Sequence, residues 1–163
     1  MISQLLLNHM NETSTHITAI ASGDGEHLTV AGGQYRILVS GQDTEGKYAI
    51  IEMNVPPGGG PPPHAHPEVE ELFYVAEGEL EFKTESGATI AAQGAFVRIA
   101  LYGGIHAFKN RGDKPARLLC TVMPAGMDEM FKEASTATPD QLPGIMKKYK
   151  QVMYPPDYLD KNV

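Results

Sequence analysis

Residues 56–82 read PPGGGPPPHAHPEVEELFYVAEGELEF and combine a proline-glycine run, a histidine pair and a strand-like run. The first eight residues, 56–63, cannot hold a helix or a β-ladder, because proline lacks the amide hydrogen and glycine weakens a strand. His64 and His66 follow directly. In an extended segment residues i and i+2 share a face, so we expect both imidazoles to converge on one point. The pair predicts a metal site, although two surface histidines at a strand end would give the same pattern.

Three carboxylates follow the histidine pair, at Glu68, Glu70 and Glu71, and a further histidine, His106, lies in a later strand-like run. Imidazole together with carboxylate suits a first-row divalent metal. If the strand continued straight from His66, alternation would bring Glu68 or Glu70 to the histidine face.

Pro67 interrupts that alternation, because it breaks the ladder and favours a turn over residues 67–69. With Glu71 facing inward, the same strand also points Phe73 and Val75 inward. With Glu70 facing inward, the inner row becomes Leu72, Tyr74 and Ala76. The residues alone leave both facings open. Phe108, two residues beyond His106, shares its face and is predicted to line the pocket or to pack in the core.

Length and composition predict one globular domain. The chain has 163 residues, 42% of them hydrophobic and 20% charged. Lys and Arg number 13 against 20 Asp and Glu, a net charge of −7 that disfavours nucleic acid and anionic membrane surfaces as partners. No apolar run approaches the ~20 residues that span a bilayer. Cys120 is the single cysteine and cannot form an internal disulfide, so we expect a cytoplasmic location.

Turn signals recur about every 8–12 residues through most of the chain, which is typical of an all-β sandwich or barrel. The strand-like runs are 34–39, 47–55, 72–83, 89–92, 96–100, 106–109 and 116–123. We therefore expect a β-barrel over residues 34–124. Residues 1–33 are expected to form an N-terminal segment that supplies an extra or exchanged strand, or alternatively a mobile arm.

The hydrophobic period changes after Pro124, and residues 125–163 are expected to form a helical tail packed on the barrel. Two apolar stripes at helical spacing carry this expectation. The first is Met127, Met130, Phe131 and Ala134, and the second is Leu142, Ile145, Met146, Tyr149 and Met153. Thr138-Pro139-Asp140-Gln141 has the features of a helix start, which Pro143 could delay.

Two spaced motifs resemble the paired motifs of the cupin superfamily. The first is Gly58-x5-His64-x-His66-x4-Glu71-x6-Gly78, and the second is Gly103-x2-His106-x3-Asn110. The chain is similar over roughly residues 34–153 to small single-domain bacterial cupins that resemble quercetin 2,3-dioxygenase-like proteins. It departs from the second motif at Leu101, where proline is usual, and at Gly94, which lies one residue too far upstream.

The resemblance implies a cupin double-stranded β-helix, a jelly-roll barrel, with a short C-terminal helical tail. It implies that His64, His66, Glu71 and His106 bind one divalent transition metal per chain, which could be Fe, Mn, Ni, Co, Cu or Zn. The family spacing thus favours Glu71 over Glu70. Phe73, Val75 and Phe108 are then the expected pocket residues.

The function implied by the resemblance is that of a metal-dependent dioxygenase-like enzyme. Four protein ligands would leave two adjacent positions on the metal, which suits an enol, a hydroxy-ketone or a similar chelating small molecule. One alternative is a non-redox isomerase or decarboxylase with Glu70 or a tyrosine as proton donor, and another is a non-enzymatic small-molecule-binding cupin. Small cupins of this kind also imply a homodimer formed through sheet edges.

Overall fold

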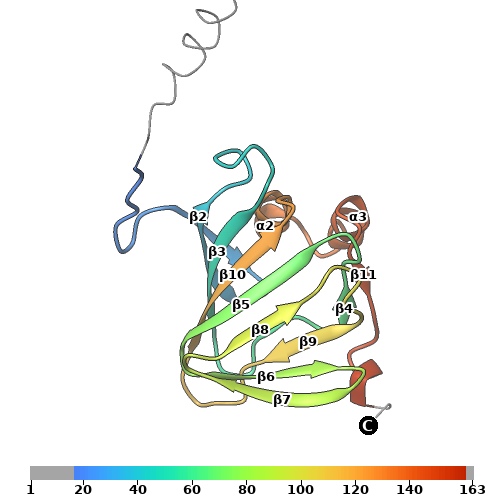
Figure 1. Cartoon of the computed structure of the whole chain (residues 1–163). Coiled ribbons are helices and arrows are strands. Elements are labelled where there is room, and N and C mark those ends of the chain that lie inside the picture. Colours follow the sequence, from blue (N-terminus) through green and yellow to red (C-terminus); the bar gives the residue numbers. More distant parts are fainter. Residues whose placement is uncertain (1–16, 161–163) are drawn as a thin grey trace, which may run out of the picture.

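Two antiparallel β-sheets enclose one interior in the computed structural model, which describes residues 17–160 (Figure 1). The larger sheet has six strands in the order β1 (Glu26–Val30), β2 (Gly33–Val39), β3 (Ala49–Val55), β10 (Ala116–Met123), β5 (Glu70–Glu77) and β8 (Phe96–Ile99). The smaller has five in the order β11 (Val152–Met153), β4 (His64–Ala65), β9 (His106–Lys109), β6 (Glu79–Thr84) and β7 (Gly87–Ala92). The predicted all-β class and the jelly-roll barrel are confirmed.

The core forms because alternate residues of the central strands are apolar. In β10, Leu118, Cys120 and Val122 are fully buried, and the residues between them face outward. This strand pairs with β3 on one side and with β5 on the other, so its inner row lies at the centre of the larger sheet. Cys120 is buried and unpaired, as expected for a lone thiol in the core.

Residues 1–33 contribute strand β1, which pairs in register with β2 of the same chain from Glu26↔Ile37 to Val30↔Gly33. Residues 1–16 of this segment lie outside the described residues. Arg36 fixes the residues that precede β1 by donating hydrogen bonds to the carbonyls of Ala21 and Asp24. β1 therefore extends the larger sheet at one edge.

The run expected as one strand over 72–83 is divided in the structure. β5 begins earlier, at Glu70, and the chain turns at Gly78 into β6, which belongs to the other sheet. Gly78 has φ 77°, and a Cβ there would lie 3.1 Å from Ala116. Glycine permits both the left-handed backbone and the close approach to β10.

The helical tail consists of α2 (Met127–Thr136) and α3 (Leu142–Lys148), which Figure 1 shows at the same end of the barrel, and a 3₁₀ turn (Tyr158–Asp160) follows. The helix start expected at 138–141 is wrong by a few residues: α3 begins at Leu142, and Pro143 occupies its first turn. Among the described residues no helix has the length and apolar character needed to cross a bilayer.

The second predicted helical stripe is also too long. Met153 lies in β11, where Val152 pairs with Ala65 and Met153 pairs with His64. The helix cannot continue because Lys150 takes a left-handed backbone, φ 57°, which turns the chain back toward β4. The turn at Lys150 therefore ends the helix before Met153, and the spacing of the apolar residues did not indicate this turn.

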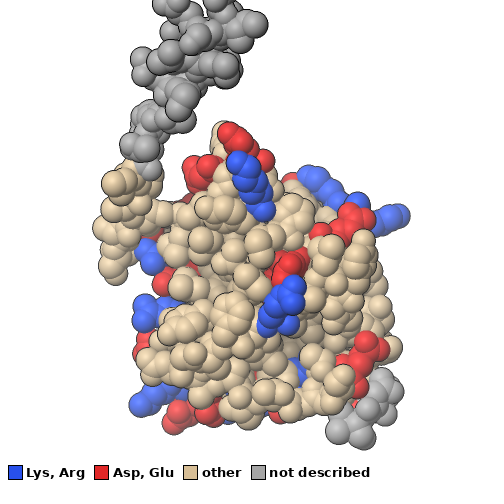
Figure 2. Space-filling model, in the orientation of Figure 1, with Lys and Arg blue, Asp and Glu red and all other residues tan. Residues whose placement is uncertain are grey.

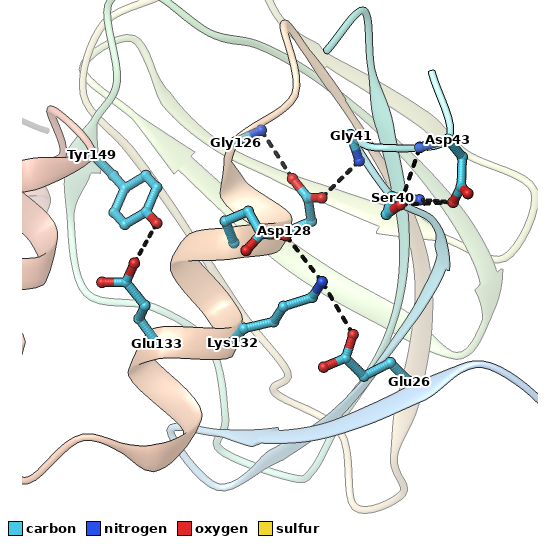
Figure 3. A network of polar contacts seen from close by, with 10 residues as sticks. Glu26, Ser40, Gly41, Asp43, Gly126, Asp128, Lys132, Glu133 and Tyr149 are labelled. Atoms are coloured by element: carbon cyan, nitrogen blue, oxygen red, sulfur yellow. Dashed lines mark hydrogen bonds and ion pairs between the residues drawn. The ribbon is translucent and has the colours of Figure 1, made fainter. Parts of the chain in front are cut away.

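α2 is attached to the barrel by a buried carboxylate (Figure 3). Asp128 accepts hydrogen bonds from the backbone amides of Gly41, at 2.7 Å, and Gly126, at 2.9 Å. The side chain is fully buried, so the amides on the loop after β2 and at the start of α2 are satisfied by the same group. Lys132, one turn further along, forms an ion pair with Glu26 of β1. These contacts fix where the first helix lies.

We expect Asp128→Ala to lower the free energy of unfolding by about 2–4 kcal/mol, because two part-buried amides would lose the fully buried carboxylate that accepts from them. Asp128→Asn, which keeps one acceptor oxygen, should cost less. Urea denaturation of both variants measures the difference. Asp113→Ala is the control, because Asp113 is exposed. A loss for Asp128→Ala no larger than that of the control would contradict the role of this carboxylate.

Candidate metal centre

Three strands bring four potential metal ligands together. His64 and His66 come from β4 and the residue after it, Glu71 from β5, and His106 from β9. His64 and His106 are direct partners across the β4–β9 pair. One ligand atom from each side chain lies within 4.8 Å of all the others, and all four residues are buried. Two sheets thus contribute to a single buried cluster.

The distances within this cluster are those of a compact site. His66 Nε2 lies 2.9 Å from Glu71 Oε2 and 3.1 Å from His106 Nε2. His106 Nε2 lies 3.4 Å from the same carboxylate oxygen. The three imidazole rings have centroid separations between 4.5 and 5.5 Å.

Each imidazole is oriented by a backbone carbonyl. His64 Nδ1 lies 3.0 Å from the oxygen of Pro62, His66 Nδ1 lies 3.1 Å from that of Val69, and His106 Nδ1 lies 3.1 Å from that of Gly104. A carbonyl only accepts, so each Nδ1 carries a proton and donates it. Each Nε2 is then available as a ligand atom, an arrangement usual for metal-binding histidines.

The donor set fits a divalent transition metal. With a proton on each Nδ1, the Nε2 atoms of His66 and His106 direct lone pairs at each other across 3.1 Å, which requires a proton or a cation between them. Two donors bound at ~2.1 Å to one ion lie about 3.0 Å apart at a right angle and about 4.2 Å apart when opposite. The separations of 2.9, 3.1 and 3.4 Å among His66, Glu71 and His106 lie near the right-angle value. Three nitrogens and one carboxylate oxygen suit Fe, Mn, Co, Ni, Cu and Zn.

Burial and neighbouring charges shift the pKa values of the cluster. Burial, assisted by the nearby His106, lowers the pKa of His64 to about 4. Burial acts in the same direction on His66, but its hydrogen bond with Glu71 and the charge of that carboxylate raise the pKa of His66 overall. Burial opposes ionisation of Glu71, yet hydrogen bonds from His106 and His66 lower its pKa to about 2. Glu71 is thus ionised at neutral pH.

The structure brings Glu71, and neither Glu68 nor Glu70, to the histidines. The amide of Val69 donates to the carbonyl of His66 at 3.1 Å, which closes a turn after Pro67 and resets the facing of the strand. Glu70 then points outward and pairs with Arg98. Glu68 pairs with Lys150.

An apolar cavity of about 500 Å³ lies against the cluster, and His64 and Glu71 form part of its wall. Phe73 and Phe108, two of the three residues predicted for the substrate pocket, line this cavity. Val75 is fully buried, but it packs in the core outside this lining, because it lies further along β5 than Phe73.

The helical tail supplies much of the remaining wall, including Met127, Met130 and Met146. The apolar stripes of the tail signalled that these residues are covered, but not that they face a cavity. Tyr35 and Gln151 also line it and no sequence motif identified them. Cys120 reaches the cluster from β10, with its sulfur 3.8 Å from Glu71 Oε1, and burial raises the pKa of this thiol.

We expect the metal-free protein to lose stability in acid through His64. Its pKa is about 4 in the folded chain against 6.5 ordinarily, so the unfolded chain binds more protons between these values and stability falls as the pH drops from 6.5 to 4. Over this pH range the free energy of unfolding of His64→Asn should fall by up to about 3 kcal/mol less than that of the wild type.

Urea denaturation of chelator-treated protein at pH 7 and pH 4 measures this loss. His27→Asn is the matched control, because His27 is exposed and lies outside the cluster. Its loss between the two pH values should equal that of the wild type. An equally large loss in His64→Asn would show that another group carries the acid sensitivity.

Residues 51–122 match the family described as Cupin domain (Cupin_2). The chain is 31% identical over 85 residues to Nectarin-1 from Nicotiana langsdorffii x Nicotiana sanderae, a match that covers 50% of this chain and 37% of that protein. It is 33% identical over 113 residues to Germin-like protein 5-1 from Oryza sativa subsp. japonica, covering 64% and 50%. The chain therefore spans between about a third and a half of the length of these relatives.

Solved structures with the same fold include a sugar phosphate isomerase from a cupin superfamily, from Silicibacter pomeroyi (TM-score 0.58, 20% identity, covering 65% of this chain and 75% of that one). A predicted oxalate decarboxylase from Thermotoga maritima has TM-score 0.58 and 21% identity, covering 66% and 99%. KdgF from Halomonas sp. has TM-score 0.60 and 16% identity, covering 70% and 99%. Residues 51–122 thus match a cupin domain, and the solved structures share the fold of this chain.

Proposed function

We propose that this protein is a metal-dependent, dioxygenase-like enzyme that acts on a small chelating molecule such as an enol or a hydroxy-ketone. The observation that carries the proposal is the buried cluster of three imidazoles and one carboxylate in the wall of an apolar cavity. Histidines on a solvated surface would not need a backbone carbonyl to orient each ring, whereas here three carbonyls orient three rings. The arrangement instead resembles a site prepared for an ion.

His64, His66, Glu71 and His106 are the proposed ligands of one divalent transition metal per chain. Such an ion would act as a Lewis acid toward the neighbouring oxygens of the bound molecule and, where it is redox-active, would allow reaction with O₂. The low pKa of Glu71 keeps its carboxylate available as a ligand across the physiological range. Phe73 and Phe108 exclude water from this side of the cluster, which strengthens its electrostatic effect on a ligand.

A non-redox isomerase or decarboxylase is the second candidate, and Tyr35 is the observation in its favour. Tyr35 lines the same cavity, and burial raises the pKa of its hydroxyl so that it stays protonated. It can therefore donate a proton to a strongly basic centre, such as a carbanion formed in the cavity. Glu70, the other proton donor considered, pairs with Arg98 and does not line the cavity.

Elemental analysis of protein purified without an immobilised-metal column tests the proposal. We expect about one transition metal per chain in the wild type. His106→Asn and Glu71→Gln should lower the metal affinity by more than ~100-fold, because the first removes an imidazole ligand and the second replaces an anionic ligand by a neutral amide. His27→Asn is the control and should keep its metal, because His27 is not in the cluster.

The identity of the metal decides between the two candidates. Fe, Mn, Co, Ni or Cu, together with O₂ uptake on addition of an enol or hydroxy-ketone, would support the dioxygenase-like enzyme. Zn without O₂ uptake would favour the isomerase or decarboxylase. A wild type that takes up no metal at neutral pH would contradict both and leave a small-molecule-binding barrel.

We further propose that the protein works in the cytoplasm as a homodimer. Tyr74 of β5 and Phe96 of the edge strand β8 are direct partners and are 44% and 61% exposed. Figure 2 shows that the face over these two strands is mostly uncharged, and the charged residues on the two strands include Arg98 and Glu70, which pair with each other. Large apolar side chains grouped at a sheet edge favour association with a second copy.

Sedimentation velocity tests the proposed dimer. The wild type should sediment as a dimer, and Phe96→Lys should shift it toward the monomer, because a charge would be buried without a partner in the interface. Ile90→Lys is the control: Ile90 is 57% exposed but lies in β7 of the other sheet. A monomeric wild type at micromolar concentration would contradict the dimer.

A further inference from the structure

The cavity beside the cluster offers no counter-ion to a charged ligand. Among the described residues that line it there is no lysine and no arginine, and Glu71 is its only acidic side chain. Apart from His64 and Glu71, the polar side chains in the wall are two neutral ones, Tyr35 and Gln151. A charge carried away from the cluster would therefore be buried without compensation, which is strongly unfavourable.

Tyr35 presents an unpartnered hydroxyl in this wall. The residue is 8% exposed, and its ring packs edge-on against Phe131 of α2 at a centroid distance of 5.2 Å. Its hydroxyl forms no hydrogen bond with any residue between 17 and 160. Burial, assisted by the charge of the nearby Glu71, raises the pKa of the Tyr35 hydroxyl, so Tyr35 remains a hydrogen-bond donor near the cluster.

Gln151 presents a second unpartnered group. The residue is 9% exposed, and its backbone amide donates to the carbonyl of Met146 at 2.8 Å. Its side-chain amide has no partner within the described part of the chain. Gln151 directly precedes β11, whose Met153 pairs with His64, so the pairing that holds the tail also holds this amide beside the cluster.

Polar side chains that are nine-tenths buried are normally hydrogen-bonded, because an unmade hydrogen bond costs free energy. Among the described residues, every side-chain nitrogen or oxygen that is fully occluded has a hydrogen-bond partner. The unpartnered polar atoms of Tyr35 and Gln151 are therefore still accessible to small molecules. Both residues line the cavity, where a ligand can supply the missing partner for the hydroxyl of Tyr35 and the amide of Gln151.

We propose that Tyr35 and Gln151 determine the specificity of this cavity and that its ligand is an uncharged, mainly apolar molecule with a hydrogen-bonding group in addition to its chelating oxygens. The chelating part of this inference rests on the proposed function. The cavity discriminates against ligands that carry a phosphate or carboxylate away from the cluster. The apolar part of the ligand contacts Phe73, Phe108 and the methionines of the tail.

Three 5-hydroxy-4-pyranones that differ only at carbon 2 test the discrimination. Allomaltol carries a methyl group there, kojic acid a hydroxymethyl group and comenic acid a carboxylate. Their affinities are measured by calorimetry on protein whose metal content has first been determined. We expect comenic acid to bind at least tenfold more weakly than kojic acid, because its carboxylate finds no cation in the wall.

Tyr35→Phe and Gln151→Leu identify the recognising groups. Each should lower the affinity for kojic acid about three- to tenfold, the effect of one neutral hydrogen bond, and leave that for allomaltol within about twofold. Tyr48→Phe and Gln42→Leu are the matched controls, since both residues are exposed and lie outside the cavity. Equal binding of kojic and comenic acids by metal-loaded protein, or unchanged kojic acid affinity in both variants, would overturn the inference.

A metal-free arm separates this inference from the proposed function. Chelator-treated protein is titrated with 2-naphthol and with 2-methylnaphthalene, which differ by one hydroxyl. Wild type should prefer 2-naphthol, and Tyr35→Phe or Gln151→Leu should reduce that preference about three- to tenfold. A wild type that takes up no metal but shows this preference would refute the proposed function alone. Absence of any such preference in wild type would overturn the inference, whatever the metal content.

Discussion

The buried carboxylate of Glu71 is the constraint on which the site depends. A carboxylate that is 2% exposed is stable only where donors or cations compensate its charge. His66 and His106 supply nitrogen partners, and the thiol of Cys120 contacts the second oxygen. Glu71, His106 and Cys120 lie on β5, β9 and β10, and His66 directly follows β4, so the carboxylate joins groups from both sheets. A divalent ion would satisfy the same requirement more completely.

Much of this cluster could be predicted from sequence because it depends on local geometry. The histidine pair shares a face by strand alternation, and the strands themselves follow from apolar residues between turn signals. The choice between Glu70 and Glu71 could not be made in this way. It depends on the turn that the amide of Val69 closes after Pro67, which changes the facing by one residue. Only the family spacing favoured the residue that the structure brings to the histidines.

The cavity could not be predicted because its wall combines segments that are distant in sequence. An apolar stripe on α2 indicates that one face of the helix is covered. It does not distinguish a face that packs in the core from one that lines a cavity. What decides is where the helix lies, and Asp128 fixes this by joining its first turn to the loop after β2. Gln151 reaches the cavity only because Lys150 turns the chain into β11. Neither contact has a periodic signature.

The charge distribution of the cavity relates the cluster to its ligand. Glu71 is the only acid in the described wall and there is no lysine or arginine, so a divalent ion would leave the cluster with one net positive charge. That charge would attract the ionised oxygen of a chelating group, while the rest of the wall, apolar apart from two neutral polar side chains, would accept only uncharged parts of the molecule. A ligand polarised in this way would bind in one orientation, with its acidic end at the cluster. The same asymmetry would reject a molecule charged at both ends, because only one of its charges could be compensated.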